Sequence, residues 1–564
     1  MTAWLVANIA PVMFASLLVF LLTGFPVAFG LAATGIVFGF VAVEMGLAPA
    51  QFFNALPLRL YGIMSNDTLL AIPFFTFMGL ILERSRMAED LLETIGQVFG
   101  PMRGGLAIAV IVVGAMLAAT TGVVAASVIA MGLISLPIML RYGYNRPLAA
   151  GVITASGTLA QIIPPSLVLI VIADQLGRSV GDMYRAAFLP AFGLVAIYAV
   201  AVMVVAVVRP HWVPALPIGA RLFKEPSGSS GYGSLSVLTG LSMLAGGLVF
   251  ANYAEILKAL GNASDYAPPT DETVVMSLMA AIASALVIAV VDKGLGINRL
   301  SQLARRVTFV LIPPLLLVFL VLGTIFLGIA TPTEGGAMGA AGAMLLAMVR
   351  KRLDFKLLKQ ALDASARLSI FVVFVLVGST IFSLTFQAID GPHWVEKLFT
   401  SLPGGQLGFL IFVNTLIFIL GCFIDFFEIA FILLPLLGPV ADKLGIDLIY
   451  FGVMVGLVLQ TSFLTPPFGF ALFYLRSVAP GKAYVDPVTK AHIAPLATVD
   501  IYKGSMAFVV LQLLMVAAVM IEPKIIMAGL GEKKVLDLEN VNMKITAPEE
   551  EEEDAAGMMS APKK

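Results

Sequence analysis

The chain has 564 residues, of which 59% are hydrophobic and only 12% are charged, with a formal net charge of −1. This composition excludes an ordinary soluble protein, in which about a quarter of the residues are charged, and it gives no argument for binding nucleic acid. The long apolar runs do not alternate as the strands of a membrane β-barrel would. We therefore predict an all-α polytopic membrane protein.

Nine segments are long and apolar enough, or nearly so, to cross a hydrocarbon core of about 30 Å. They are 17–43, 68–82, 186–208, 235–251, 274–291, 307–330, 335–349, 368–386 and 503–521. The N-terminal stretch lacks the basic start of a signal peptide and its apolar run is too long for one, so we expect it to be retained. The runs predict a multi-pass protein of the lipid bilayer.

The two halves of the chain resemble each other at an offset of roughly 300 residues. Four stretches recur in the same order: 23–35 and 331–343, 69–83 and 368–382, 120–137 and 421–435, and 157–174 and 458–475. Because transporters often contain two structural repeats, we predict one repeat in 1–208 and a second in 306–529.

The distribution of basic residues indicates how the two repeats are oriented. The segment 84–103 holds three arginines, whereas its counterpart 384–403 has only one lysine. Conversely, 350–367 is strongly basic, while 44–65 has one arginine. Lys and Arg accumulate in short cytoplasmic loops, so equivalent loops face opposite sides of the membrane. This pattern predicts an inverted-topology repeat.

The first repeat contains a small-residue stretch followed by a pair of prolines. We expect a re-entrant hairpin over about 104–137, with its tip near Thr121–Val124, and a broken helix over about 148–174. Pro164 and Pro165 cannot sustain a regular helix. An unwound link exposes carbonyl oxygens suited to Na⁺ and half-helix N-termini suited to carboxylates.

Residues 209–305 have no counterpart at the N-terminal end, and we interpret them as an inserted helix pair with loops. The second repeat is then expected to form a hairpin over about 405–438 and a broken helix over about 446–475. The end of the chain, 530–564, is acidic and of low complexity, which is typical of a disordered tail.

The tip of the second hairpin carries Asp425 in an otherwise apolar run. A carboxylate at membrane depth needs a partner, and no Lys or Arg lies near it in sequence. A bound cation would supply that partner, but Asp425 could instead cap a helix by accepting backbone N–H bonds. The two roles are compatible. Cys422 is the single cysteine and is expected to pack as a small apolar residue.

Four motifs together resemble the large membrane subunit of tripartite ATP-independent periplasmic (TRAP) transporters. They are "NDTLLAIPFFTFMGLILE", "GTLAQIIPPSLVLIVIAD", "GIATPTEGGAMG" and "LTPPFGFALF". The likeness covers about 17–208 and 307–529. It implies a non-enzymatic, multi-pass protein of the bacterial inner membrane, with an elevator fold like that of the ion-transporter superfamily. Such a protein imports an organic acid with Na⁺, receives it from a periplasmic binding protein, and is braced by a small four-helix membrane subunit.

The same resemblance places two sodium sites and a substrate site, with many ligands expected to be backbone carbonyls. The first sodium site would involve Thr120, Gly122, Ser156, Gly157 and Ile163. The second would involve Gly421, Asp425, Thr461 and Thr465. Substrate would lie between the hairpin tips, near Thr121, Ser127, Pro165, Ser166 and Pro467.

The chain departs from the family pattern in three places, and two other functions remain open. Its first tip reads "TTGVVAAS" where relatives often have a serine-rich tip, and both 209–305 and 481–497 exceed the usual length. A channel is one alternative, since broken helices also build selectivity filters. An intramembrane enzyme using Asp425 and Glu428 is less favoured, because the sequence offers no activated nucleophile or metal cluster.

Overall fold

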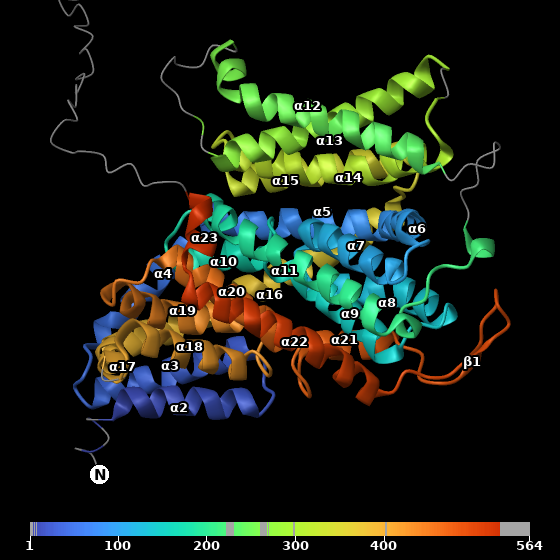
Figure 1. The fold of residues 1–564 in the computed structure, drawn as a ribbon. Coiled ribbons are helices and arrows are strands. Elements are labelled where there is room, and N and C mark those ends of the chain that lie inside the picture. The colour runs from blue at the N-terminus through green and yellow to red at the C-terminus, as the bar shows by residue number, and fades with distance from the viewer. Residues whose placement is uncertain are drawn as a thin grey trace, which may run out of the picture. The chain divides into compact units, whose positions relative to one another are not determined.

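The computed structural model describes residues 4, 6 and 8–530, apart from 222–230, 260–267, 269, 297–298 and 401–402. The described part is helical except for a short antiparallel pair, β1 (Tyr484–Val485) and β2 (His492–Ile493) (Figure 1). Eight of its helices are long and apolar enough to cross a membrane. The predicted all-α polytopic fold class is thus confirmed. The expected acidic tail, 530–564, lies outside the described residues from 531 onward.

From residue 8 to residue 208, which the structure describes without a gap, the first half forms thirteen helical segments. They are α2 (Ile9–Leu22), α3 (Val27–Glu44), η1 (Ala50–Ala55), α4 (Leu56–Met64), η2 (Asp67–Leu70), α5 (Ala71–Arg84), α6 (Met87–Phe99), α7 (Gly105–Thr121), α8 (Val124–Arg141), α9 (Arg146–Thr158), η3 (Leu159–Gln161), α10 (Leu167–Gln175) and α11 (Val180–Val208). The apolar run 17–43, expected as one segment, is divided between α2 and α3, because Pro26 has an extended backbone and caps α3. Segment 68–82 belongs to a pair of helical stretches bent by 46°.

The second half follows the same order of elements. It comprises α14 (Gln302–Phe326), α15 (Pro332–Val349), α16 (Phe355–Ala388), α17 (Gly391–Thr400), α18 (Gly405–Leu420), α19 (Phe426–Lys443), α20 (Leu448–Phe463), α21 (Phe470–Val478), α22 (Thr498–Ile521), α23 (Lys524–Met527) and η6 (Ala528–Leu530). Helix α15 begins at a capping box in which Thr331 and Glu334 bond each other's backbone N–H groups. Glu334 therefore has a structural role at a helix N-terminus.

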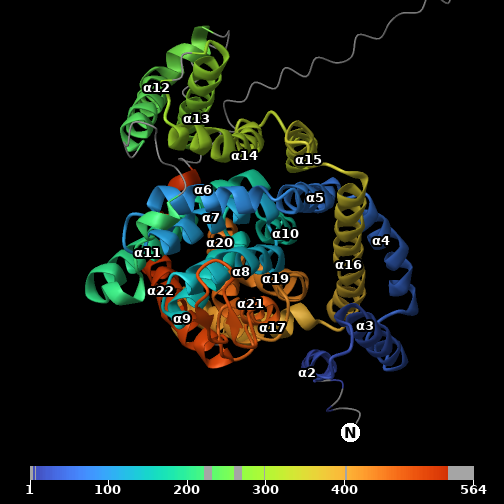
Figure 2. The same ribbon diagram turned by 90° about the vertical axis from the view of Figure 1, so that its right-hand side faces the viewer.

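Helices of the two halves pack on each other in reciprocal pairs. Helix α3 packs on α16 and α5 packs on α15, and Figure 2 shows α16 between α3 and α5. In the same way, α9 packs on α22 and α20 on α11, while α8 packs on α21 and α19 on α10. Exchanging the halves maps each pair onto the other. This is the arrangement that two repeats related by a pseudo-two-fold axis produce.

The segment between the halves contains two long helices, α12 (Tyr232–Ala259) and α13 (Thr270–Gly294), and the short η4 (Pro210–Trp212) and η5 (Ile218–Ala220). The long helices pack on each other and on α14, beside which they lie in Figure 1. Gly246 allows the close approach, because a Cβ there would lie 2.8 Å from the carbonyl oxygen of Ser277. The Tyr232 hydroxyl donates to the carbonyl of Val98 at 2.8 Å. The inserted pair is therefore attached to α14 and α6.

The extra stretch 481–497 forms the β1–β2 ribbon and contacts the end of α8. Arg141 Nε donates to Asp486 Oδ1 at 2.9 Å, and Thr489 donates to Oδ2 through its backbone N–H and its hydroxyl. Loss of solvation at this carboxylate would raise its pKa, but these hydrogen bonds and the Arg141 charge outweigh that effect and lower the pKa of Asp486 to about 2. The ribbon is thus held to α8 by a carboxylate that stays ionised.

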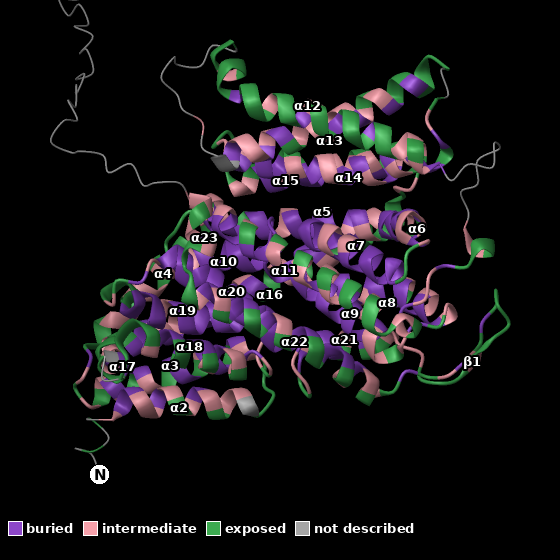
Figure 3. Ribbon diagram, in the orientation of Figure 1, coloured by how far each residue is buried: buried purple, intermediate pink, exposed green. Residues whose placement is uncertain are grey.

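Burial identifies the centre of the fold. All sixteen residues of α20 are buried, as are Leu167–Ala173 of α10. Figure 3 shows burial concentrated on α7, α9, α10 and α20, with long exposed stretches on α12. The first broken helix and the α20 part of the second thus lie in the interior, whereas the outer helices present apolar side chains to the surroundings.

The contact between α9 and α22 depends on two glycines. A Cβ at Gly504 would lie 1.8 Å from the carbonyl oxygen of Pro147, and a Cβ at Gly151 would lie 2.3 Å from the carbonyl oxygen of Gly504. Two helix backbones approach this closely only where neither residue has a side chain.

We expect Gly504→Ala to destabilise the protein by about 1–3 kcal/mol or more, because the new methyl group must push two backbones apart. The midpoint of thermal unfolding in detergent measures this. Gly247→Ala in α12 is the control, since a Cβ there meets no atom within 4 Å and alanine favours helices. Equal midpoints for the two variants would contradict the close packing of α9 on α22.

Candidate functional site

The first hairpin turns at Gly122–Val123, between α7 and α8. Gly122 has a positive φ of 60° and lies against the start of α10, because a Cβ there would be 3.0 Å from Leu167 Cγ and 3.3 Å from Leu167 N. A side chain larger than hydrogen would be strained in this backbone conformation and would crowd Leu167. The C-terminal end of α7 therefore meets the N-terminal end of α10.

Three hydroxyl groups lie at this tip. They belong to residues predicted for the first sodium site or for the substrate site. Thr120 and Thr121 each donate to the carbonyl of Leu117 at 2.9 Å. The hydroxyls of Thr121 and Ser127 are 2.8 Å apart. All three side chains are buried. The partial negative charge at the end of α7 favours a cation nearby.

The last turns of α9 pack between the two arms of the hairpin. A Cβ at Gly157 would lie 2.3 Å from Val128 Cγ2, next to Ser127 at the tip. Ser156 instead lies against Gly114, two turns before the tip, and its hydroxyl donates to the carbonyl of Val152 at 2.6 Å. The structure thus places Gly157 close to the tip, but it does not bring the Ser156 hydroxyl there.

The link between α9 and α10 holds polar groups without partners in a buried environment. Within the described part of the chain, no hydrogen bond reaches the carbonyl oxygens of Ile162, Ile163 or Pro164, all of which are buried. Ser166 caps α10 and donates to the carbonyl of Gln161 at 2.6 Å. Buried polar groups are rarely left unpaired. This link is therefore suited to hold an ion, water or substrate.

Sequence reasoning missed Gln161, whose side chain is fully buried. Neither its amide oxygen nor its amide nitrogen has a hydrogen-bond partner among the described residues. The sequence did contain a sign of this residue, since Gln161 is a polar amide in an apolar run, three residues before the proline pair. Next to it in space, the Tyr184 hydroxyl donates to the carbonyl of Ser166 at 3.3 Å. Gln161 thus adds a donor and an acceptor to the first link.

The second hairpin turns between Leu420 and Phe426 and meets the end of α20. A Cβ at Gly421 would lie 2.2 Å from Ser462 Oγ, and the Cys422 thiol approaches the carbonyl oxygen of Ser462 at 3.8 Å. The residue that meets this tip is therefore Ser462. Its neighbour Thr461, which the family resemblance implies as a sodium ligand, donates its hydroxyl to the carbonyl of Leu457 at 2.8 Å, and its role at a sodium site stays a prediction.

Asp425 is the N-cap of α19. Its Oδ1 accepts from Phe426 N at 2.8 Å, and Glu428 Oε2 accepts from Asp425 N at 3.2 Å. The two carboxylates thus form a reciprocal capping box. The structure shows the capping role, while coordination of an ion by Asp425 stays a prediction.

The second link is more open than the first. The Thr465 hydroxyl donates to the carbonyl of Thr461 at 2.8 Å. No hydrogen bond reaches the carbonyl oxygens of Leu464 or Pro466 within the described residues. Pro467 is exposed, whereas its counterpart Pro165 is buried. The two halves are thus equivalent in their elements but not in their access to the surroundings.

Phenylalanine side chains lie at this opening. The rings of Phe423, from the hairpin tip, and Phe468, from the link, are 4.8 Å apart, and both side chains are exposed. The Tyr502 hydroxyl donates to the carbonyl of Pro467 at 3.3 Å. The predicted substrate residues therefore divide into a buried group around the first tip, which includes Thr121, Ser127 and Ser166, and an exposed Pro467.

Comparison with known proteins identifies relatives along most of the chain. Residues 14–525 match the family model described as "Tripartite ATP-independent periplasmic transporter, DctM component". The C4-dicarboxylate TRAP transporter large permease protein of Rhodobacter capsulatus is 27% identical over 83% of this chain and 90% of its own length. The sialic acid TRAP transporter large permease protein of Vibrio cholerae is 23% identical over 81% of this chain and 87% of its own length.

One solved structure shares the fold. The crystal structure of the YdaH transporter of Alcanivorax borkumensis superposes with a TM-score of 0.50 and 13% sequence identity, covering 87% of this chain and 97% of that one. At this identity the likeness concerns the fold alone.

Two substitutions at Asp425 separate its capping role from its charge. Asp425→Ala should destabilise α19 by about 1 kcal/mol, because the backbone N–H of Phe426 loses its acceptor. Asp425→Asn keeps an oxygen that can cap and should preserve most of that stability. Thermal unfolding of both variants in detergent without Na⁺ checks this. If both variants had the same unfolding midpoint as the native protein, the capping box would contribute nothing measurable to stability.

Proposed function

Because the chain belongs to the family of DctM components of TRAP transporters, as the motifs indicated, we propose that it imports an organic acid together with Na⁺. The family and the apolar helices make it a multi-pass permease of the bacterial inner membrane. In the proposal a periplasmic binding protein delivers the substrate, and a small four-helix membrane subunit braces the permease. Transport proceeds by an elevator movement.

The observation that carries the proposal is the meeting of each hairpin tip with an unwound link. Gly122 lies against the start of α10, and Gly421 lies against Ser462 just before the second link. Each link also contains carbonyls without hydrogen-bond partners in the described residues, among them those of Ile163 and Pro466. Unwound carbonyls in broken helices are the usual ligands of coupling Na⁺ ions. The residues present therefore fit Na⁺.

The proposed sodium ligands are those that the family resemblance implies, together with one residue that the packing adds. In the first half the candidates are the C-terminal carbonyls of α7 at Thr120 and Gly122, together with those of Gly157 and Ile163. In the second half they are groups of Gly421, Asp425, Thr461 and Thr465, to which the contact with the hairpin adds Ser462. Na⁺ would neutralise the negative end of α7 and of α18 and supply the driving force, about 2.3 kcal/mol per charge for every 100 mV.

The proposed substrate is a carboxylate held between the tips. The N-terminal ends of α8 and α10, which follow Val123 and Ser166, carry partial positive charge that favours an anion. Hydroxyls of Thr121 and Ser127 lie at the same tip. The named cargoes of the two relatives, a C4-dicarboxylate and sialic acid, both bear a carboxylate, which supports this class without selecting one member.

For the elevator, the mobile part would comprise the hairpins and broken helices, and the scaffold would comprise α2 to α5 and α12 to α16. Small or hydroxyl-bearing residues stand at two of the contacts between these parts. A Cβ at Gly79 of α5 would lie 2.5 Å from Thr121 Cα, and the Ser379 hydroxyl of α16 donates to the carbonyl of Phe431. Sliding would also have to break the hydrogen bond from Asn66 Nδ2 to Asp174 Oδ1 and separate the rings of Phe371 and Phe427.

Reconstitution into vesicles with the cognate binding protein and small subunit tests the transport proposal. With radiolabelled carboxylates, succinate and sialic acid first, we expect accumulation only under an inward Na⁺ gradient. Asp425→Asn should weaken the Na⁺ dependence, while Asp442→Asn, an exposed carboxylate on the same helix, should leave it unchanged. Accumulation that persists without Na⁺ would reject coupling, and equilibration without the binding protein would indicate a channel.

Paired spin labels test the elevator movement. After Cys422 is replaced by serine, labels at Leu345→Cys on α15 and Leu133→Cys on α8 connect the proposed scaffold and mobile part, and both positions are exposed. We expect their distance distribution to change when Na⁺ and the binding protein are added in liposomes. A control pair within the scaffold, Leu345→Cys and Val37→Cys, should not change. A distance distribution between α8 and α15 that stays the same under all conditions would rule out rigid-body sliding.

A further inference from the structure

A cavity of about 520 Å³ lies between the inserted helix α13 and the scaffold helices α14 and α15. Four cationic side chains line it: Lys293, Arg305, Arg306 and Arg350. Among the described residues that line the cavity there is no carboxylate. The cavity therefore has a positive lining, and it belongs neither to the hairpin tips nor to the links.

The rest of the lining is largely apolar. It includes Phe309, Val310 and Pro313 on α14 and Leu346 and Val349 on α15. Val349 is 73% exposed, so this wall continues onto the outer surface of the helices. Helices α13 and α14 are both among the candidate membrane spans. The cavity thus combines a cationic end with an apolar wall, at the end of two membrane helices.

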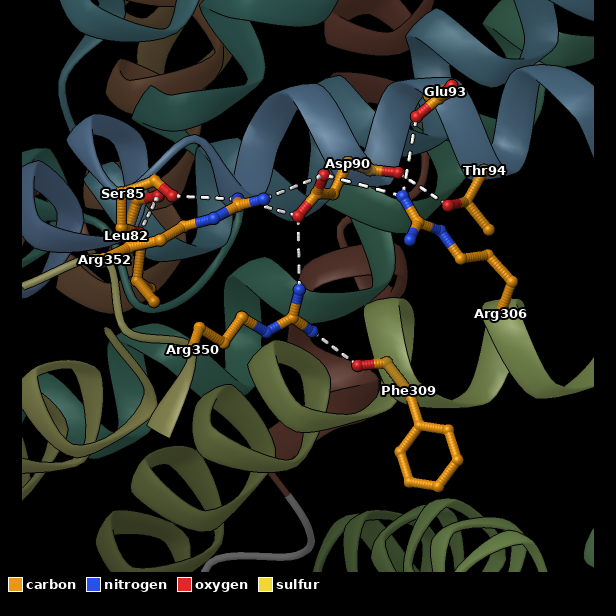
Figure 4. A network of polar contacts seen from close by, with 9 residues as sticks. All are labelled: Leu82, Ser85, Asp90, Glu93, Thr94, Arg306, Phe309, Arg350 and Arg352. Atoms are coloured by element: carbon orange, nitrogen blue, oxygen red, sulfur yellow. Dashed lines mark hydrogen bonds and ion pairs between the residues drawn. The ribbon is translucent and has the colours of Figure 1, made fainter. Parts of the chain in front are cut away.

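Figure 4 shows how the arginines are positioned. Arg306, Arg350 and Arg352 converge on Asp90 of α6, at 3.7, 3.2 and 2.8 Å from its carboxylate oxygens. Arg306 also lies 3.5 Å from Glu93. Because three guanidinium groups share two carboxylates, positive charge remains in excess. Arg306 is 42% exposed, so it can still turn part of its guanidinium toward the cavity.

Two further cations reach the cavity, Lys293 from α13 and Arg305 from α14. Lys293, at the end of α13, places Nζ 5.3 Å from the ring centre of Phe309. Arg305 pairs with Asp292 at 3.2 Å. A guanidinium has five N–H donors, so an ion pair does not exhaust it. Cations thus converge on the cavity from both α13 and α14.

We propose that this cavity binds an anionic phospholipid, with its phosphodiester group between Lys293, Arg305 and Arg306. One acyl chain would lie along Val310 and Val349. Basic pockets between membrane helices on the cytoplasmic side bind such headgroups, and the strongly basic 350–367 segment assigns this end to the cytoplasm. The apolar wall favours a lipid over free phosphate. A phosphate ion alone would not cover the apolar side chains, which would then stay in contact with water. The lipid would connect the inserted helix α13 to α14 and α15.

Native mass spectrometry of the full-length detergent-solubilised protein tests the proposal. Phosphatidylglycerol is titrated against phosphatidylethanolamine, which has the same chains but no net charge. We expect one tightly retained phosphatidylglycerol, and a roughly fivefold loss of affinity for each cation removed. The variants are Lys293→Gln, which leaves the Asp90 network intact, and Lys293→Gln with Arg306→Gln. Lys258→Gln, at the far end of α12, is the matched control and should retain the lipid.

Three results would overturn the proposal. Equal retention of the two lipids would show that charge does not select the occupant. Unchanged binding in Lys293→Gln would place the lipid elsewhere, and this variant remains informative even if the double variant unfolds. Displacement of the lipid by millimolar inorganic phosphate would show that the cavity recognises a free anion instead.

Discussion

The absence of water from the membrane interior is the constraint on which this structure depends. Backbone groups released by a proline pair must be enclosed by protein there, since each unsatisfied group costs several kcal/mol. The fold meets this need by seating a hairpin tip near each break, Gly122 near the first link and Gly421 near the second. The enclosure is incomplete at the carbonyls of Ile162, Ile163 and Pro164, and this deficit is what makes a cation site physically reasonable.

Reciprocal packing explains why two weakly similar halves can build one molecule. In the six pairs named above, a helix of one half packs on a helix of the other, so each broken helix is covered partly by the opposite half. Such symmetry also permits two states of similar stability in which the halves exchange environments. Pro165 is buried and Pro467 is exposed, so the two halves differ in their surroundings although their sequences repeat.

The insertion gives the scaffold an additional outer layer. Helices α12 and α13 pack on α14 and are attached through Tyr232 to α6. The nearby cluster of Asp90 with three arginines joins α6 of the first half to α14 and the α15–α16 connection of the second. The Asp90 side chain is 14% exposed, while Arg306 is 42% and Arg352 35% exposed, so these partly solvated pairs fix the relative position of the elements more than they add stability. The proposed lipid would act at the same junction.

The sequence by itself determined the class of the protein, its repeats and the places where helices must break, because hydropathy and proline act locally. The paired motifs also led to the family. Only the tertiary structure decided which residues meet the hairpins: Ser462 lies against Gly421, and Gly157 lies against Val128 beside the first tip. It also revealed Gln161 as an unpaired buried amide. Such choices depend on packing between segments far apart in the chain, which no local pattern records.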